Sequence, residues 1–140
     1  MRFVSRLSKD SQGPTVMLYE IVAAGRILLG AGLMMHPGVF GGLWLGRATA
    51  KQPVTRYHSR INGGREAALG ASLLSTVGNA QGMKRLLWVG ALFDIWDACV
   101  AFFVGGSLGK HRRAQAVIAP AIWVALSIMA SRQIKHDHFH

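Results

Sequence analysis

Acidic residues are scarce in this chain of 140 residues, which has six Asp and Glu against sixteen Lys and Arg and a formal net charge of +10. It has one cysteine, Cys99, so it cannot form an internal disulfide. Catalytic motifs are missing too: the sequence contains no phosphate-binding loop, CxxC pair, nucleophile elbow or HExxH. The sequence therefore indicates neither a reaction nor a cofactor. It favours a binding or structural protein over an enzyme.

Long polar segments are also lacking, because four apolar runs use most of the chain. Hydrophobic residues make up 51% of the sequence, which is high for a small soluble protein. Three runs approach the roughly 20 residues that cross a bilayer as a helix, and the second does so only if it begins near Arg60. We predict an all-α four-transmembrane-helix bundle in a single integral membrane domain, residues 1–140. The expected helices cover about residues 15–36, 60–79, 83–105 and 114–131.

The segment between the first two expected helices is predicted to lie at the membrane interface. Pro37 and Gly38 should stop the first helix, and the following GVFGGLWLGRA is too short to span. The next stretch, KQPVTRYHSR, is expected to be a basic surface loop in which Pro53 breaks any helix. Pro120, in the fourth apolar run, should kink the last helix without ending it.

The basic residues flank the apolar runs instead of forming one polar face. This placement is typical of anchors beside anionic lipid headgroups, and it disfavours nucleic-acid binding. We expect a multi-pass protein of the cell membrane whose partners are membrane lipids, with further copies of the chain or a larger membrane complex as additional partners. The closing HDHFH sequence spaces three histidines at alternate positions, and we favour a solvated tail over a metal site there.

Charged residues inside the expected helices are the main candidates for function. Six lie away from the ends of these helices: Glu20, Arg26, Arg65, Glu66, Asp94 and Asp97. Unpaired, each would cost about 2.5 to 3.5 kcal/mol near a helix centre, so they should face inward and find partners. Helix direction and a rise of about 1.5 Å per residue place Arg26 at the depth of Asp94. The same arithmetic places Arg65 at the depth of Asp97.

Glu66 is predicted to be the surplus carboxyl of this cluster, because its neighbour Arg65 points to a different part of the helix surface. Glu20 lies near a membrane face and should reach water. The candidate ligand-binding or buried charge cluster is Arg26, Arg65, Glu66, Asp94 and Asp97. Glycines at positions 25, 30, 63, 64 and 90 leave room beside it, so we expect a cavity bordered by the first three helices and open toward residues 36–60. No metal ligands and no catalytic residues are predicted.

Three short patterns carry a resemblance: Gly25-Arg26 followed by Gly30, R-x-x-G-x-R-E-x-x-L-G at 60–70, and G-x-x-x-D-x-x-D at 90–97. With them the chain resembles a group of small four-helix bacterial membrane proteins of actinobacterial type without assigned activity, loosely DoxX-like. Glu66 stands where that group often has Asp. The resemblance implies a four-helix bundle of the bacterial inner membrane with an inward charge cluster. It also implies a redox accessory role with a quinone, because some DoxX-like proteins are linked to membrane oxidoreductase systems.

Three functions remain open on these observations. The first is a scaffold or accessory subunit whose charge cluster holds the fold together or binds a small polar ligand or lipid headgroup. The second is a small proton- or ion-coupled transporter, since ionisable groups within a membrane often mark ion pathways. The third is a DoxX-like redox accessory subunit that uses a quinone.

Overall fold

A computed structural model describes residues 14–134, apart from the side chains of residues 14–17, 44 and 108; the HDHFH tail lies outside this range. The described elements are α1 (Pro14–Met35), α2 (Pro37–Leu45), α3 (Arg47–Ala50), α4 (Pro53–Ser75), α5 (Ala80–Val104), a 3₁₀ helix (Gly105–Leu108) and α6 (Lys110–Gln133). No strand occurs within residues 14–134. The all-α prediction is confirmed for this part of the chain.

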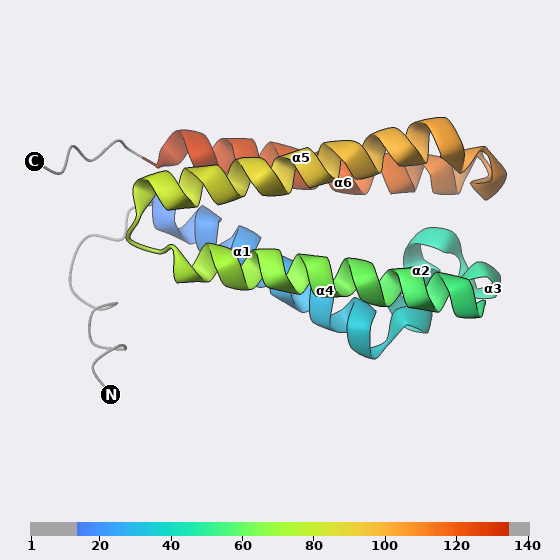
Figure 1. Ribbon diagram of the computed structural model, residues 1–140. Coiled ribbons are helices and arrows are strands. Elements are labelled where there is room, and N and C mark those ends of the chain that lie inside the picture. The colour runs from blue at the N-terminus through green and yellow to red at the C-terminus, as the bar shows by residue number, and fades with distance from the viewer. Residues whose placement is uncertain (1–13, 135–140) are drawn as a thin grey trace, which may run out of the picture.

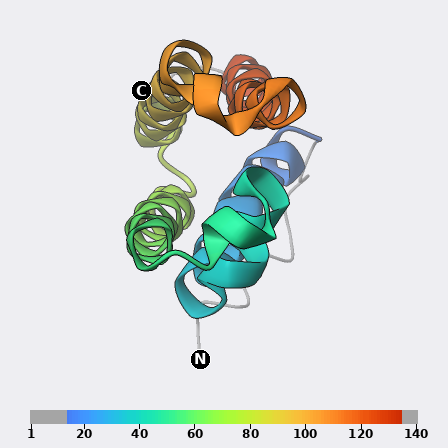
Figure 2. The same ribbon diagram turned by 90° about the vertical axis from the view of Figure 1, so that its right-hand side faces the viewer.

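The four long helices form two antiparallel pairs, α1 with α4 and α5 with α6 (Figure 1). The pairs stack on each other, so that α5 lies over α4 and α6 lies over α1 (Figure 2). The turn between α4 and α5 lies at the end where the described chain begins and finishes. The opposite end carries α2 and α3 and the turn between α5 and α6 (Figure 1). We call this second end the capped end.

Glycines allow α1 and α4 to approach until their backbones touch. A Cβ atom at Gly30 would lie 2.5 Å from the backbone nitrogen of Ala67 and 2.5 Å from the carbonyl oxygen of Gly63. One at Gly70 would lie 2.6 Å from the carbonyl oxygen of Ala23. Small residues are the usual means by which helices pack this closely in a membrane. A Cβ at Gly64 would meet nothing within 4 Å, so Gly64 takes no part in this contact.

The main apolar core lies toward the end of the molecule opposite the cap. It joins all four long helices through the buried residues Tyr19, Val22, Ala23, Leu73, Met83, Leu87 and Ala130, with Ile134 just beyond α6. The fully buried Tyr19 hydroxyl donates to the carbonyl oxygen of Leu73 at 2.6 Å and lies 2.8 Å from the Thr76 hydroxyl. This bond satisfies a buried polar group and ties α1 to the end of α4.

The starts of three helices differ from those expected, and α4 also ends earlier, at Ser75 instead of near residue 79. α4 begins at Pro53 instead of near residue 60, because proline is well suited to the first position of a helix, where its missing N–H costs nothing. α5 begins at Ala80, where the Asn79 side chain accepts a hydrogen bond from the Gly82 N–H and caps the helix. α6 begins at Lys110 instead of near residue 114, and it continues through Pro120 as predicted.

The segment between α1 and α4 is mostly helical, and the expected loop over KQPVTRYHSR is wrong, because α4 already begins at Pro53. α2 follows α1 directly, with Pro37 in its first turn, and α3 is a single turn. The backbone turns between them at Gly46, whose φ of 86° favours glycine. Beside this turn, the Arg112 guanidinium of α6 donates to the carbonyl oxygen of Leu45, which holds the end of α2 against α6.

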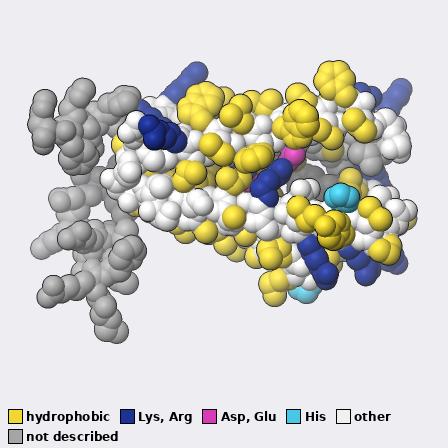
Figure 3. All heavy atoms as spheres, viewed as in Figure 1, with side chains coloured by type: hydrophobic (Ala, Val, Ile, Leu, Met, Phe, Trp, Pro, Cys, Tyr) yellow, Lys and Arg dark blue, Asp and Glu magenta, His cyan; other side chains and the backbone are white. Residues whose placement is uncertain are grey.

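Large apolar side chains cover much of the outer surface (Figure 3). Leu28, Trp96, Phe103 and Val104 are each more than two-thirds exposed to the surroundings. Among the described residues, three segments are long and apolar enough to cross a membrane: Leu18–Met35, Ala80–Ser107 and Lys110–Gln133. α4 is not among them, because it carries four charged residues: Arg56, Arg60, Arg65 and Glu66.

Candidate functional site

The structure brings all five predicted cluster residues together between the two helix pairs. Arg26 lies midway along α1 and is 1% exposed. One end of its guanidinium donates to a Glu66 oxygen on α4, and the other end donates to Oδ2 of Asp94 on α5. Glu66 and Asp94 are 5% and 3% exposed, so the three charges are all shielded from the surroundings. A single arginine thus joins three helices.

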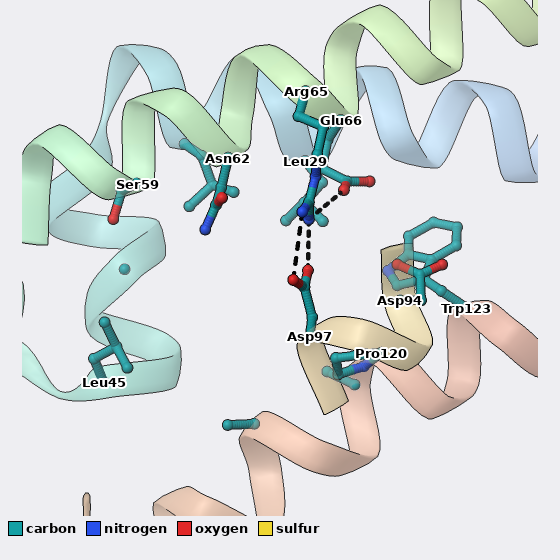
Figure 4. Close-up of a pocket in the computed structure, with 14 residues that line it drawn as sticks. Leu29, Leu45, Ser59, Asn62, Arg65, Glu66, Asp94, Asp97, Pro120 and Trp123 are labelled. Atoms are coloured by element: carbon teal, nitrogen blue, oxygen red, sulfur yellow. Dashed lines mark hydrogen bonds and ion pairs between the residues drawn. The ribbon is translucent and has the colours of Figure 1, made fainter. Parts of the chain in front are cut away.

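Arg65 forms the outer part of the same network (Figure 4). Its Nη2 donates to Oδ2 of Asp97 at 2.5 Å and to Oε1 of Glu66 at 3.1 Å, and its Nη1 donates to Oδ1 of Asp97 at 3.3 Å. The side chains of Arg65 and Asp97 are 25% and 35% exposed. The network therefore runs from a buried centre at Arg26 to a half-exposed edge at Asp97.

The two ion pairs expected from helix depth, Arg26 with Asp94 and Arg65 with Asp97, are both present. The prediction for Glu66 is wrong, because Glu66 pairs with both arginines. Adjacent residues leave a helix in different directions, but the long arginine side chain brings the guanidinium of Arg65 back to its neighbour. Glu20 does not belong to the network: it is half-buried and forms no ion pair with another described residue.

Two glycines make room for the large side chains of the site. A Cβ at Gly90 would lie 3.1 Å from Nη2 of Arg26. A Cβ at Gly25 would lie 2.6 Å from the indole of Trp123, which reaches across from α6. The Arg26 guanidinium carbon lies 5.2 Å from the centre of the Trp123 ring, a favourable cation–π distance. Trp123 was not among the predicted site residues, because its sequence position does not show whether the indole faces lipid or the interior of the bundle.

A cavity of about 220 Å³ opens beside the network. Its polar wall comes from α4 and α5: Ser59, Asn62, Arg65, Glu66, Asp94 and Asp97 (Figure 4). Its apolar wall comes from α1, α2 and α6: Leu29, Leu33, Gly41, Leu45, Ala116, Ala119, Pro120 and Trp123. The expected cavity is present and extends toward the 36–60 segment. The contribution of α6 was not foreseen, because no charged residue of that helix faces the cluster.

Residues that line this cavity carry unpaired polar groups of both kinds, because the buried Nε–H of Arg65 has no acceptor among the described residues. Within residues 14–134, Oδ1 of Asp94 accepts no hydrogen bond, while its Oδ2 is taken by Arg26. Pro120 has no N–H to donate, so the carbonyl group of Ala116, four residues before it on the cavity wall, lacks its usual helical partner. The network itself holds three carboxylates and two guanidiniums, which leaves one negative charge in excess when all are ionised.

No group of three or more His, Cys, Asp or Glu residues among the described residues could hold a metal ion. The comparisons with known proteins give no further guide, since no family model, curated protein or solved structure matches the chain.

Proposed function

We propose that this protein is a four-span integral membrane protein that acts as a scaffold or accessory subunit and holds a small ligand in the cavity between its helix pairs. In this proposal α4 is the fourth span. Its two central charges, Arg65 and Glu66, are neutralised by ion pairs within the protein. Its other two, Arg56 and Arg60, are exposed in its first two turns, where they would reach lipid headgroups.

The observation that carries the proposal is the division of the cavity into a charged wall and an apolar wall. Small-molecule sites typically combine an apolar lining with a few convergent polar groups. Oδ1 of Asp94 is a free acceptor, Asn62 and Ser59 offer both donors and acceptors, and the excess charge of the network is negative. The charge therefore decides the class of ligand. A ligand with a hydrogen-bond donor or a cationic amine at one end, and an apolar body against Leu29, Leu33 and Trp123, would satisfy both walls. An anionic headgroup would be repelled by the extra carboxylate.

Calorimetric titration of the purified protein in a non-ionic detergent would test this ligand class. The probes are three compounds of nearly the same shape: phenethylamine, phenethyl alcohol and phenylacetate. We expect the amine to bind best and the carboxylate worst. Asp94→Asn should weaken amine binding by about tenfold, the loss expected for a hydrogen bond to a charged group. Arg132→Gln, on the exposed side of α6, should bind as the parent does. Equal affinity for all three compounds would contradict the proposal.

Proton-coupled transport is the second candidate, and the gradient of exposure along the network favours it. The carboxylates run from half-exposed Asp97 to buried Asp94, the arrangement that a proton path into the protein needs. Proton flux into proteoliposomes would test it, with Glu66→Gln, Asp94→Asn and Asp97→Asn combined in one variant. Loss of flux in that variant would support transport, and flux equal to that of the parent would exclude this cluster as the path.

A further inference from the structure

A second hollow, of about 480 Å³, lies at the capped end of the molecule, away from the charge cluster. Its lining includes Arg47 of α3, Lys51 of the following turn and Arg56 of the first turn of α4, with His36 at the start of α2. Lys and Arg side chains gather at this end of the surface (Figure 3). We call this feature the basic hollow.

The charge of the basic hollow is not compensated within the described part of the chain. No acid lines it. Within residues 14–134, neither Arg47, Lys51 nor Arg56 forms an ion pair. Three described acids are engaged in the central network, and Glu20 lies on the second turn of α1 at the other end of the molecule. Three permanent cations around one concavity create a local positive potential that attracts an anion.

Apolar side chains border the same hollow, and they indicate which kind of anion would fit it. Val39 and Leu43, four residues apart on one face of α2, are 65% and 66% exposed. His36, which lines the hollow, directly follows the apolar stretch Leu18–Met35 in the chain. If that stretch crosses the membrane, as in the proposed function on which this step rests, the hollow lies at headgroup level. Cations and exposed apolar groups side by side at that level match a phospholipid better than a free ion.

We propose that the basic hollow binds the phosphate group of an anionic phospholipid. Arg47, Lys51 and Arg56 contact the phosphate, and Val39 and Leu43 contact the first part of an acyl chain. Arginine and lysine are the usual phosphate ligands in proteins. The site is separate from the central cavity, which carries excess negative charge and takes a ligand of opposite character.

The test uses the full chain in a non-ionic detergent, titrated with short-chain phosphatidylglycerol, short-chain phosphatidylcholine and inorganic phosphate. We expect phosphatidylglycerol to bind at least about tenfold more tightly than the other two, and its affinity to fall as salt is raised. Combining Arg47→Gln, Lys51→Gln and Arg56→Gln should weaken it by about fivefold for each cation removed. Combining Val39→Ser and Leu43→Ser should weaken the binding of phosphatidylglycerol but not the binding of inorganic phosphate.

A matched control removes the same net charge elsewhere. Arg85→Gln, Lys110→Gln and Arg132→Gln together change three exposed cations that do not line the hollow. This variant should bind phosphatidylglycerol as the parent does. Equal losses in the two triple variants would overturn the site in favour of a general charge effect. Inorganic phosphate binding as tightly as phosphatidylglycerol would overturn the assignment to lipid. Neither result bears on the amine titration of the central cavity, so the two proposals fail separately.

Discussion

At the scale of single residues, Arg26 has the greatest influence on the site. It is almost fully buried, it donates to acids on two other helices, and its guanidinium also lies against Trp123. Its two partners differ from each other in their further contacts. Glu66 also accepts a hydrogen bond from Arg65, whereas Asp94 has only Arg26 as a partner among the described residues. The three side chains should therefore respond differently to removal.

Arg26→Leu should destabilise the protein by about 3 to 5 kcal/mol, because it strands the buried Asp94 charge. Asp94→Leu should cost less, since Arg26 keeps Glu66. The double change Arg26→Leu with Asp94→Leu should also cost less than Arg26→Leu alone, because Glu66 still has Arg65. Thermal melts in detergent would rank the three variants, with the exposed Arg132→Leu as a control expected to change stability by less than about 0.5 kcal/mol. A loss in the double variant equal to the sum of the two single losses would contradict this ranking and show that these charges act independently.

At the scale of helices, glycine spacing sets how closely α1 and α4 pack. A Cβ at Gly63 would lie 2.7 Å from the carbonyl oxygen of Gly30 and 2.9 Å from the Leu33 Cβ, whereas one at Gly64 would lie in open space. Backbone atoms cannot rotate aside as a flexible side chain can. Two neighbouring glycines in one helix thus have opposite environments.

Gly63→Ala should destabilise the protein by about 1 to 3 kcal/mol, the usual range for overpacking a close contact. Gly64→Ala should be neutral or stabilising by up to about 1 kcal/mol, because alanine favours helix over glycine. The same thermal melts measure both, and each variant serves as the other's control. A loss at Gly64 as large as that at Gly63 would contradict the packing described here.

Element boundaries show where sequence reasoning succeeded and where it failed. The cores of the long helices were predictable from apolar runs, but α4 was predicted to begin too late, since Pro53 is compatible both with a broken helix and with a first helical turn. The region of α2 and α3 was expected to be a short interfacial segment, and no helix was predicted there. Their helical form depends on contacts with α1, α4 and α6, which local sequence does not reveal.

The charge network was predictable as far as depth along each helix determines it. Helix direction and rise brought Arg26 to Asp94 and Arg65 to Asp97. The contact of Arg26 with Glu66 was missed, because it depends on how α1 and α4 are rotated about their axes. That rotation is fixed by the glycine contacts at Gly30 and Gly70. The apolar wall from α6 was missed for a similar reason: Pro120 and Trp123 carry no charge by which depth could be matched.

At the scale of the whole molecule, polar and apolar groups are distributed in the reverse of a soluble protein. On the face viewed in Figure 3, acidic side chains appear only in the hollow between the helix pairs, and large apolar side chains lie outside. The two pairs meet through the apolar core at one end and through the ion pairs and cavity toward the capped end. An apolar exterior around a polar interior is stable only if lipid or another apolar phase covers the outside.

Cys99 allows a direct test of this arrangement, because it is the only cysteine in the chain and is exposed on α5. It lies about 8 Å along the helix from the middle of the Ala80–Ser107 stretch, inside the roughly 15 Å half-thickness of a hydrocarbon core. In lipid nanodiscs, Cys99 should therefore react slowly with a charged, water-soluble maleimide. It should react readily once the protein is unfolded in a denaturing detergent, as measured by the mass added to the protein.

The control is Cys99→Ser with Lys110→Cys, which moves the thiol to the exposed first residue of α6 at the capped end. Nanodiscs leave both membrane faces open to the reagent, so this thiol should react quickly whichever way the protein is inserted. The contrast between the two positions measures burial in lipid, because both side chains are exposed on the protein itself. If Cys99 reacts as quickly as the thiol at position 110, α5 does not cross the bilayer, and the proposed membrane bundle is wrong however the charge network behaves.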